Sequence, residues 1–483
     1  LTLAGYAFFI AHGLSPHIDP WSQAFINLAV QHIYPKEGQE DTTVLLFREE
    51  NIASLDSHYP VPYDVHAQVI EALASYEPRA VFIDFAFVDK RRGEDVGPLT
   101  EALCALSREG KTRLFLAAPV DETGRVLIRR ELQRCAGLAT PEIFPLESSE
   151  GLLAYTRGSE FIPQDSGSAL ENVESAFMPS AAFALAEDIG VPATGEDLEI
   201  VWGKGVAPLN REWMDCREPG RWHQIRTLLT EGPLANRLKC PYTRTITVAH
   251  LLNSSGDRDI EDSLKGRTVF YGADFNFSGD RIRSPVYAEM PGVYLHAMAY
   301  DNLKSFGHNY KRLVPPAGDE RYVNIALLLI IALVLVKCER TPAGEAQSAT
   351  EFIFRLVLSA GGGLIALVVL LLVAGQLGLD SALLLAGALF LLHRGWRDPG
   401  FGVAAGIVLI WTVVSYFLFN MGPRNVLAFL LFFLSARSTQ EFLQEKWAGY
   451  HRLRSLEMGA ALSPRTEPAS SLTHKKTRET IHE

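Results

Sequence analysis

The chain has 483 residues, which is more than one domain usually contains, so we expect at least two structural units. A formal net charge of -11 argues against a general nucleic-acid-binding protein, because such a protein carries a basic face that neutralises phosphates. The charged residues are concentrated before Arg321 and after Arg437, and the sequence between is mostly Leu, Ala, Val, Ile, Phe and Gly. That composition is typical of membrane segments.

The first residues, "LTLAGYAFFIAHGL" (1–14), are apolar but too short to cross a membrane alone. We interpret them as the remnant of an N-terminal membrane anchor. A secretory signal is the alternative, and the anchor is favoured because no small-residue cleavage motif follows.

Residues 15–310 alternate between strand-like and helical patterns, which predicts an α/β domain with a mainly parallel sheet covered by helices. The middle segment, 120–265, is less regular: it contains a predicted helix at 179–190, and whether the rest joins the sheet stays open. Outside this segment the predicted strands are 42–47, 79–87, 112–119 and 266–275, and the predicted helices are 64–76, 98–110 and 290–305.

Two carboxylates come at the ends of predicted strands. Asp84 follows the apolar residues of one strand, and Asp274 follows "TVFYGA" in another. Ligands of parallel α/β sheets usually bind outside the carboxyl ends of the strands, so both are candidate ligand-binding residues. The alternative is that each accepts backbone hydrogen bonds in a strand-to-loop turn. His296 lies among the apolar positions of the last predicted helix, where a structural histidine near the sheet is the simpler interpretation and ligand binding the alternative.

Four cysteines, Cys104, Cys135, Cys216 and Cys240, precede the hydrophobic segments, which suits an oxidising compartment for this part of the chain. Cys216 and Cys240 lie in apparent surface turns and form the better disulfide candidate. Cys104 has helical spacing, and either a buried free thiol or a bridge to Cys135 fits the sequence.

A linker at 311–321 leads to a predicted α-helical transmembrane bundle of five spans. Lys and Arg mark alternate loops, and the positive-inside pattern places 338–355, 394–400 and 437–483 in the cytoplasm. Everything before Tyr322 then lies in the periplasm of a multi-pass protein of the bacterial inner membrane. Residues 437–483 begin with a predicted amphipathic helix and end in a predicted disordered tail. The predicted spans are 322–336, 356–375, 381–393, 402–420 and 425–436.

Two stretches of the predicted periplasmic part have a recognisable pattern, "SLDSHYPVPYDVHAQVIEALASYEPRAVFIDFAF" and "LKGRTVFYGADFNFSGDRIRSPVYAEMPGVYLHAMAYDNL". With them this part resembles the second type of CHASE sensory domain, an extracytoplasmic module associated with bacterial histidine kinases and nucleotide cyclases. The family usually shows three spans after the sensor and a cytoplasmic output domain, whereas we count five spans and only a short tail. The family features map onto Pro60, Pro62, Asp84, Phe87, Gly272, Asp280, Ser284, Pro285, Pro291, Gly292, His296 and Ala297.

The resemblance adds Asp280 to the candidate ligand-binding residues and implies a sensor that recognises a periplasmic ligand or partner. The rival hypothesis is a structural or scaffold subunit of a larger inner-membrane complex. We expect no enzyme, cofactor or metal site, because the sequence shows no phosphate-binding Gly-Lys-Ser/Thr loop, no paired zinc-ligand spacing and no Gly-x-Ser-x-Gly motif. Expected partners are membrane lipids, further copies or other membrane subunits, and a separate cytoplasmic signalling protein, but no nucleic acid.

Overall fold

The structure of the chain is a computed structural model, and all described residues belong to the first of two units, Leu1–Leu430 and Leu431–Glu483. The predicted anchor, the five predicted spans and the predicted cytoplasmic segment lie outside the described residues. No helix in the described part is long and apolar enough to cross a membrane. The described residues are 34–88, 90–91, 93–141, 154–162, 175–203, 205–214, 240–253, 256–276, 280–282 and 289–312.

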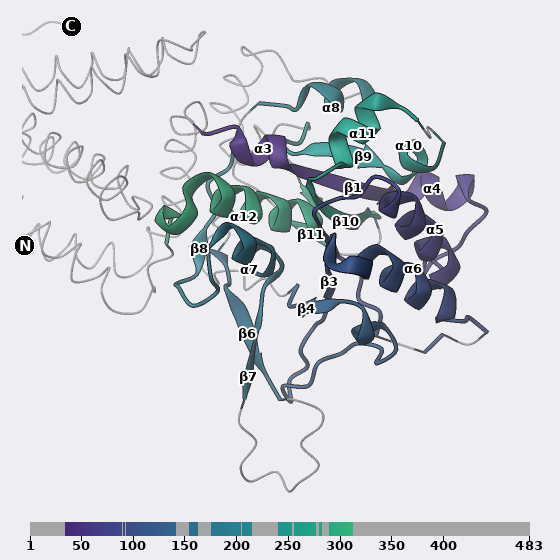
Figure 1. Cartoon of the computed structure of the whole chain (residues 1–483), viewed down its shortest axis with the longest axis horizontal. Coiled ribbons are helices and arrows are strands. Elements are labelled where there is room, and N and C mark those ends of the chain that lie inside the picture. The colour runs from purple at the N-terminus through teal and green to yellow at the C-terminus, as the bar shows by residue number, and fades with distance from the viewer. Residues whose placement is uncertain are drawn as a thin grey trace, which may run out of the picture. The chain divides into compact units, whose positions relative to one another are not determined.

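The described part is built around a six-stranded sheet in which every neighbouring pair is parallel (Figure 1). This confirms the predicted α/β class with a parallel sheet. The strand order is β4-β3-β2-β10-β1-β9, so β10, from late in the chain, lies between β1 and β2. The strands are β1 (Thr42–Arg48), β2 (Ala80–Ile83), β3 (Arg113–Ala117), β4 (Gly137–Ala139), β9 (Arg244–Thr247) and β10 (Thr268–Asp274).

The central strands are buried on both faces, which explains why they read as continuous apolar runs rather than alternating ones. Successive side chains still point to opposite faces: Val44 and Leu46 of β1 belong to one core, and Leu45 and Phe47 to the other. The first core is covered mainly by α12 (Val293–Phe306), α7 (Ala181–Ala186) and α3 (Glu37–Asp41). The second is covered by α5 (Tyr63–Ala74), α6 (Gly97–Ser107), α10 (Val248–Asn253) and α11 (Arg258–Leu264).

Helix α12 is the most deeply placed helix, because every residue from Val293 to Leu303 is buried. A helix that is covered on all sides belongs to the core of a domain, and here it packs against β1, β10, α7 and α3. At 1.5 Å per residue its 14 residues extend about 20 Å. It therefore runs along the sheet from the strand ends to the region where the described chain leaves at Arg312.

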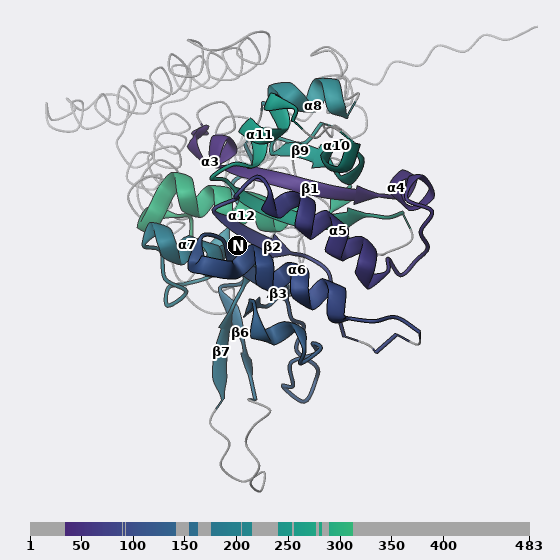
Figure 2. The ribbon, with the colours of Figure 1, turned by 45° about the vertical axis from the view of Figure 1, so that its right-hand side comes forward.

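The middle segment divides between the main sheet and smaller antiparallel pairs. Its strands β4 and β9 extend the parallel sheet at its two edges, and the hairpin of β6 and β7 extends away from the rest of the domain (Figure 2). The short pairs of this segment are β5 (Ala154–Tyr155) with β8 (Leu198–Glu199) and β6 (Gly158–Phe161) with β7 (Ala176–Pro179). A third short pair, β11 (Arg281–Ile282) with β12 (Met290–Pro291), follows later in the chain. Two further α-helices are α4 (Glu49–Ser54) and α8 (Pro208–Trp213), and the 3-10 helices are η2 (Arg108–Gly110), η3 (Leu132–Arg134), η4 (Glu187–Ile189) and η5 (Gly307–Asn309).

Candidate functional site

The candidate residues gather where β1, β10 and β2 end. Arg48 and Asp274 are register partners at the last positions of β1 and β10, and Asp84 directly follows β2. The backbone N–H of Asp84 still donates to the carbonyl of Tyr271 in β10, at 2.7 Å, and the chain then leaves the sheet. The predicted strand 79–87 therefore ends earlier than expected, at Ile83, and this early end places Asp84 at the edge of the sheet where ligands of such folds bind.

Asp274 has protein partners for its charge. Its Oδ1 lies 2.7 Å from Nη1 of Arg281, and its Oδ2 lies 3.9 Å from Nε of Arg48. The three side chains are 22–33% exposed, so water screens these pairs only in part. Asp274 thus joins the ends of β1 and β10 to the β11 segment, as a structural ion pair would.

Asp84 has a different environment. Its side chain is only 10% exposed, and its Oδ1 lies 3.8 Å from Nε2 of His296 on α12. Nδ1 of the same imidazole lies 2.7 Å from the hydroxyl of Tyr155, which also accepts the backbone N–H of Ala182 at 3.0 Å. A connected series of polar groups therefore runs from α7 through Tyr155 and His296 to the end of β2.

The hydroxyl of Tyr155 can donate to Nδ1 of His296 or accept from it, because it has one proton and a further acceptor position beside the one that Ala182 uses. With Tyr155 as the donor, the imidazole proton lies on Nε2, on the side of Asp84. Burial lowers the pKa of His296 to about 3, so the ring is neutral at neutral pH and its contact with Asp84 is not a pair of opposite charges.

Two carboxyl groups of the site disfavour ionisation. Burial raises the pKa of Asp84 well above its ordinary value, and the charge of Asp280 raises it further. Partial desolvation raises the pKa of Asp280 as well, and the neighbouring Arg281 opposes that rise. A positive charge brought beside these carboxyls would lower their pKa values and release a proton. Ionisation of these two carboxyl groups therefore responds to the charge around them.

Asp280 reaches the start of α12 because a glycine precedes that helix. The backbone N–H of Gly292 donates to the carbonyl of Asp280 at 3.2 Å, and a Cβ on Gly292 would lie within about 3 Å of the Asp280 carboxyl group. Any larger residue at position 292 would displace this side chain. The structure thus brings Asp84, Asp280 and His296 to the beginning of α12, and places Asp274 in an ion pair beside them.

Comparison with protein families identifies the domain. The sequence model of the CHASE2 domain matches residues 6–336, more than half of the chain. The chain belongs to the CHASE2 domain family. This confirms the resemblance read from the sequence, and CHASE2 is an extracytoplasmic sensory domain. No curated protein and no solved structure matches the chain.

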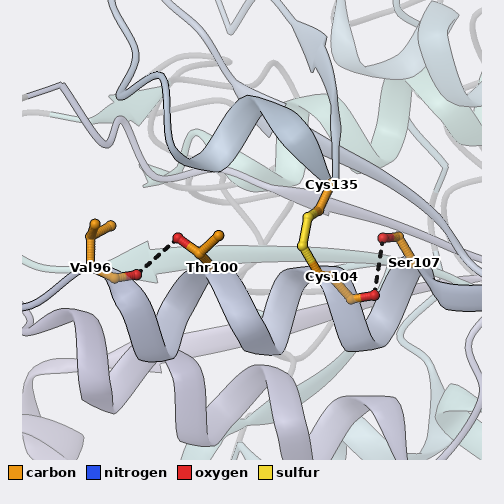
Figure 3. The surroundings of a disulfide bond; sticks show 5 residues. All are labelled: Val96, Thr100, Cys104, Ser107 and Cys135. Carbon is orange, nitrogen blue, oxygen red and sulfur yellow. Dashed lines mark hydrogen bonds between the residues drawn. A yellow bond between two sulfur atoms is a disulfide. The ribbon is translucent and has the colours of Figure 1, made fainter.

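The CHASE2 domain contains a disulfide between Cys104 of α6 and Cys135, directly after η3 (Figure 3). Of the two alternatives for Cys104, the bridge is therefore the one observed, with the Cα atoms 4.8 Å apart. Cys240 is disulfide-bonded as well, while its predicted partner, Cys216, lies outside the described residues. These bonds agree with an extracytoplasmic CHASE2 domain, because disulfides persist in oxidising compartments.

Sequence reasoning missed three residues of the candidate site. Arg281 directly follows Asp280, so a search for counter-charges near that carboxylate would have found it. Arg48 ends a strand that the sequence predicts well, but only the pairing of β1 with β10 shows that it lies opposite Asp274. Tyr155 comes from the irregular middle segment, and the sequence gives no signal of its contact with His296.

Within the described part, no group of three His, Cys, Asp or Glu side chains is arranged to hold a metal ion.

Proposed function

We propose that the protein is a membrane-anchored sensor whose CHASE2 domain recognises a periplasmic ligand or partner at the ends of β1, β10 and β2. The contact of Asp84 with His296 supports this proposal most directly, because it joins the end of β2 to α12. Helix α12 leads toward the predicted linker and spans. A change that separates Asp84 from His296 would thus act on the last described α-helix before the predicted linker and spans in the sequence.

A stimulus shifts a sensor only through its different affinities for two arrangements of the protein. Burial of Asp84 and Asp280 disfavours their ionised forms in the resting arrangement. A ligand that carries a positive group would favour an arrangement in which they are ionised. We propose that this difference moves α12 and that the predicted transmembrane helices pass the movement to a separate cytoplasmic signalling protein, with no catalytic step in the chain itself.

Thermal stability of the full-length protein in lipid nanodiscs tests ligand recognition. Small amines, carboxylates, sugars and nucleotides form a suitable panel. The site variants Asp84→Asn and His296→Gln keep the approximate side-chain shape, and His308→Gln, at an exposed position after α12, is the matched control. We expect a compound that raises the melting temperature of the wild type and of the control but not of the two site variants. Equal shifts in all four proteins would contradict a site at the strand ends.

A scaffold subunit remains the second candidate function, and the β6–β7 hairpin favours it. The hairpin extends from the domain in two views, and Phe177 on β7 is 42% exposed (Figures 1 and 2). An exposed aromatic residue on a projecting element is a common feature of protein interfaces. If Phe177→Ser removes a stoichiometric membrane partner from the purified protein while Asp84→Asn and His296→Gln retain it, docking rather than ligand sensing is the function.

A further inference from the structure

A second buried carboxyl group lies at the opposite end of α12. Asp301 is completely buried, and its Oδ1 accepts a hydrogen bond of 2.6 Å from the hydroxyl of Tyr34. The hydroxyl of Ser305, one turn further along α12, lies 3.3 Å from the same oxygen. Tyr34 precedes α3, so this hydrogen bond joins residues 267 positions apart: one where the described chain begins and one near where it ends.

The other oxygen of Asp301 has no hydrogen-bond partner within the described part of the chain. A fully buried carboxylate without a donor on one oxygen is costly, whereas the protonated group buries no charge. The environment offers no compensating cation, because no described side chain forms an ion pair with Asp301. The nearby cations Arg79 and Lys304 are directed at Asp41, at 2.5 and 3.7 Å.

The groups that face Asp301 are neutral hydroxyl donors, an acidic side chain and apolar side chains. Tyr34 and Asp41 face it from the N-terminal side, with Tyr242 packed edge-on against Tyr34, and Ser305 faces it from α12 itself. Helix α7, which also packs on α12, consists only of Ala, Phe and Leu. Burial, followed by the charge of Asp41, raises the pKa of Asp301 to about 7, against the lowering by the Tyr34 and Ser305 hydrogen bonds.

Helix α3 lies tightly on this carboxyl group. A Cβ added to Gly38 would lie within about 3 Å of the Asp301 Cγ and both of its oxygens. Removing the proton from Asp301 would therefore place a charge in a buried and tightly packed space. The contact between α3 and α12 must then loosen, or the carboxyl group must keep its proton.

We propose that Asp301 is a proton-linked latch: when protonated it allows α3 to pack closely against α12, and its ionisation loosens that contact. The latch joins Tyr34, where the described chain begins, to the last turns of α12, far along that helix from the Asp84 site. Proton release at Asp301 requires no ligand at the strand ends. The CHASE2 domain would thus respond to periplasmic pH by a route separate from ligand recognition.

The melting temperature of the full-length protein in nanodiscs, measured from pH 4 to pH 9, tests the latch. Asp301→Asn keeps the acceptor for Tyr34 and cannot ionise. When folding raises the pKa of an acid, the stability of the fold decreases as the pH rises from the unfolded pKa, near 3.8, to the folded pKa, near 7. We therefore expect Asp301→Asn to exceed the wild type by a margin that grows between pH 4 and pH 7 and is constant above. Asp262→Asn, at an exposed position of α11, is the control and should show no such growth.

Two further measurements distinguish a latch from a merely buried residue. Tyr34→Phe removes a hydrogen bond that lowers the pKa of Asp301, so the pKa of Asp301 should be higher in this variant. The melting temperature of the double variant Tyr34→Phe/Asp301→Asn should therefore exceed that of Tyr34→Phe by a margin that keeps growing above pH 7. Hydrogen exchange of α3, corrected for intrinsic rates, should show less protection at pH 8 than at pH 5 in the wild type and equal protection in Asp301→Asn. A pH-independent margin, or equal loss of protection in both proteins, would overturn the proposal.

Discussion

Asp84 and Asp274 follow or end neighbouring strands, yet the protein treats their charges in opposite ways. Asp274 is paired with Arg281 and Arg48, whereas Asp84 faces a neutral imidazole and a second carboxyl group. The sequence alternative of a structural role therefore fits Asp274 best. Asp84 and His296 remain the candidates for ligand recognition, because burying polar groups without full compensation is costly and such groups are common at functional sites.

The close approach of α3 to α12 gives a prediction at a single residue. Gly38→Ala places a methyl group against the buried Asp301 carboxyl, which cannot swing into solvent. We expect a loss of about 1–3 kcal/mol in the free energy of unfolding, as overpacked cores show. Denaturant unfolding of the full-length protein measures it. Gly97→Ala at the half-buried start of α6 is the matched control, because a Cβ there would meet only the exposed Asp95 side chain. An equally small effect of both variants would show that α3 yields easily.

At the scale of elements, the Cys104–Cys135 disulfide gives a second prediction. It joins α6 to the segment before β4, the edge strand of the sheet, and closes a loop with a sequence separation of 31. Replacing both cysteines by serine should lower the free energy of unfolding by about 2–4 kcal/mol, because the unfolded chain gains conformational freedom.

The reducing agent provides the control for this prediction. Dithiothreitol should destabilise the wild type more than the double serine variant, since the variant keeps only the disulfide of Cys240. Equal destabilisation of both proteins would mean that the α6 bridge contributes nothing to the fold.

The sequence predicted the elements well where one periodicity dominates. Strand 42–47 corresponds to β1, helix 64–76 to α5 and helix 290–305 to α12, because apolar runs and helical spacing there agree with burial. It could not order the strands: residues 266–275 insert between β1 and β2, and a strand pattern contains no information about its neighbours. The same limit hid the Tyr155–His296 and Tyr34–Asp301 contacts, which join residues 141 and 267 positions apart.

At the scale of the whole molecule, two buried histidines predict acid sensitivity. His66 on α5 bonds to Tyr271 on one side of the sheet, and His296 lies on the other side. Burial, helped for His66 by the charge of Arg91, lowers both pKa values to about 3. Because the unfolded histidines protonate below about 6.5, each should cost about 1.4 kcal/mol of stability per pH unit as the pH falls from 6.5 toward 3.

Denaturant unfolding between pH 7 and pH 4 measures this effect in the wild type, His66→Gln, His296→Gln and the double variant. Each single variant should lose less stability on acidification than the wild type. The two reductions should add in the double variant, since the sheet separates the sites. A wild-type slope in either single variant would mean that its histidine is not held neutral in the folded state.

The position of β10 has a consequence for biosynthesis. A chain that has emerged only as far as β9 contains β1 and β2 but lacks the strand that pairs with both, so each presents an open edge in what should be the middle of the sheet. Stable assembly has to wait until residues near 274 are available, late in translation or export. Truncated products that end earlier are therefore expected to aggregate or to be degraded rather than to accumulate as smaller folded units.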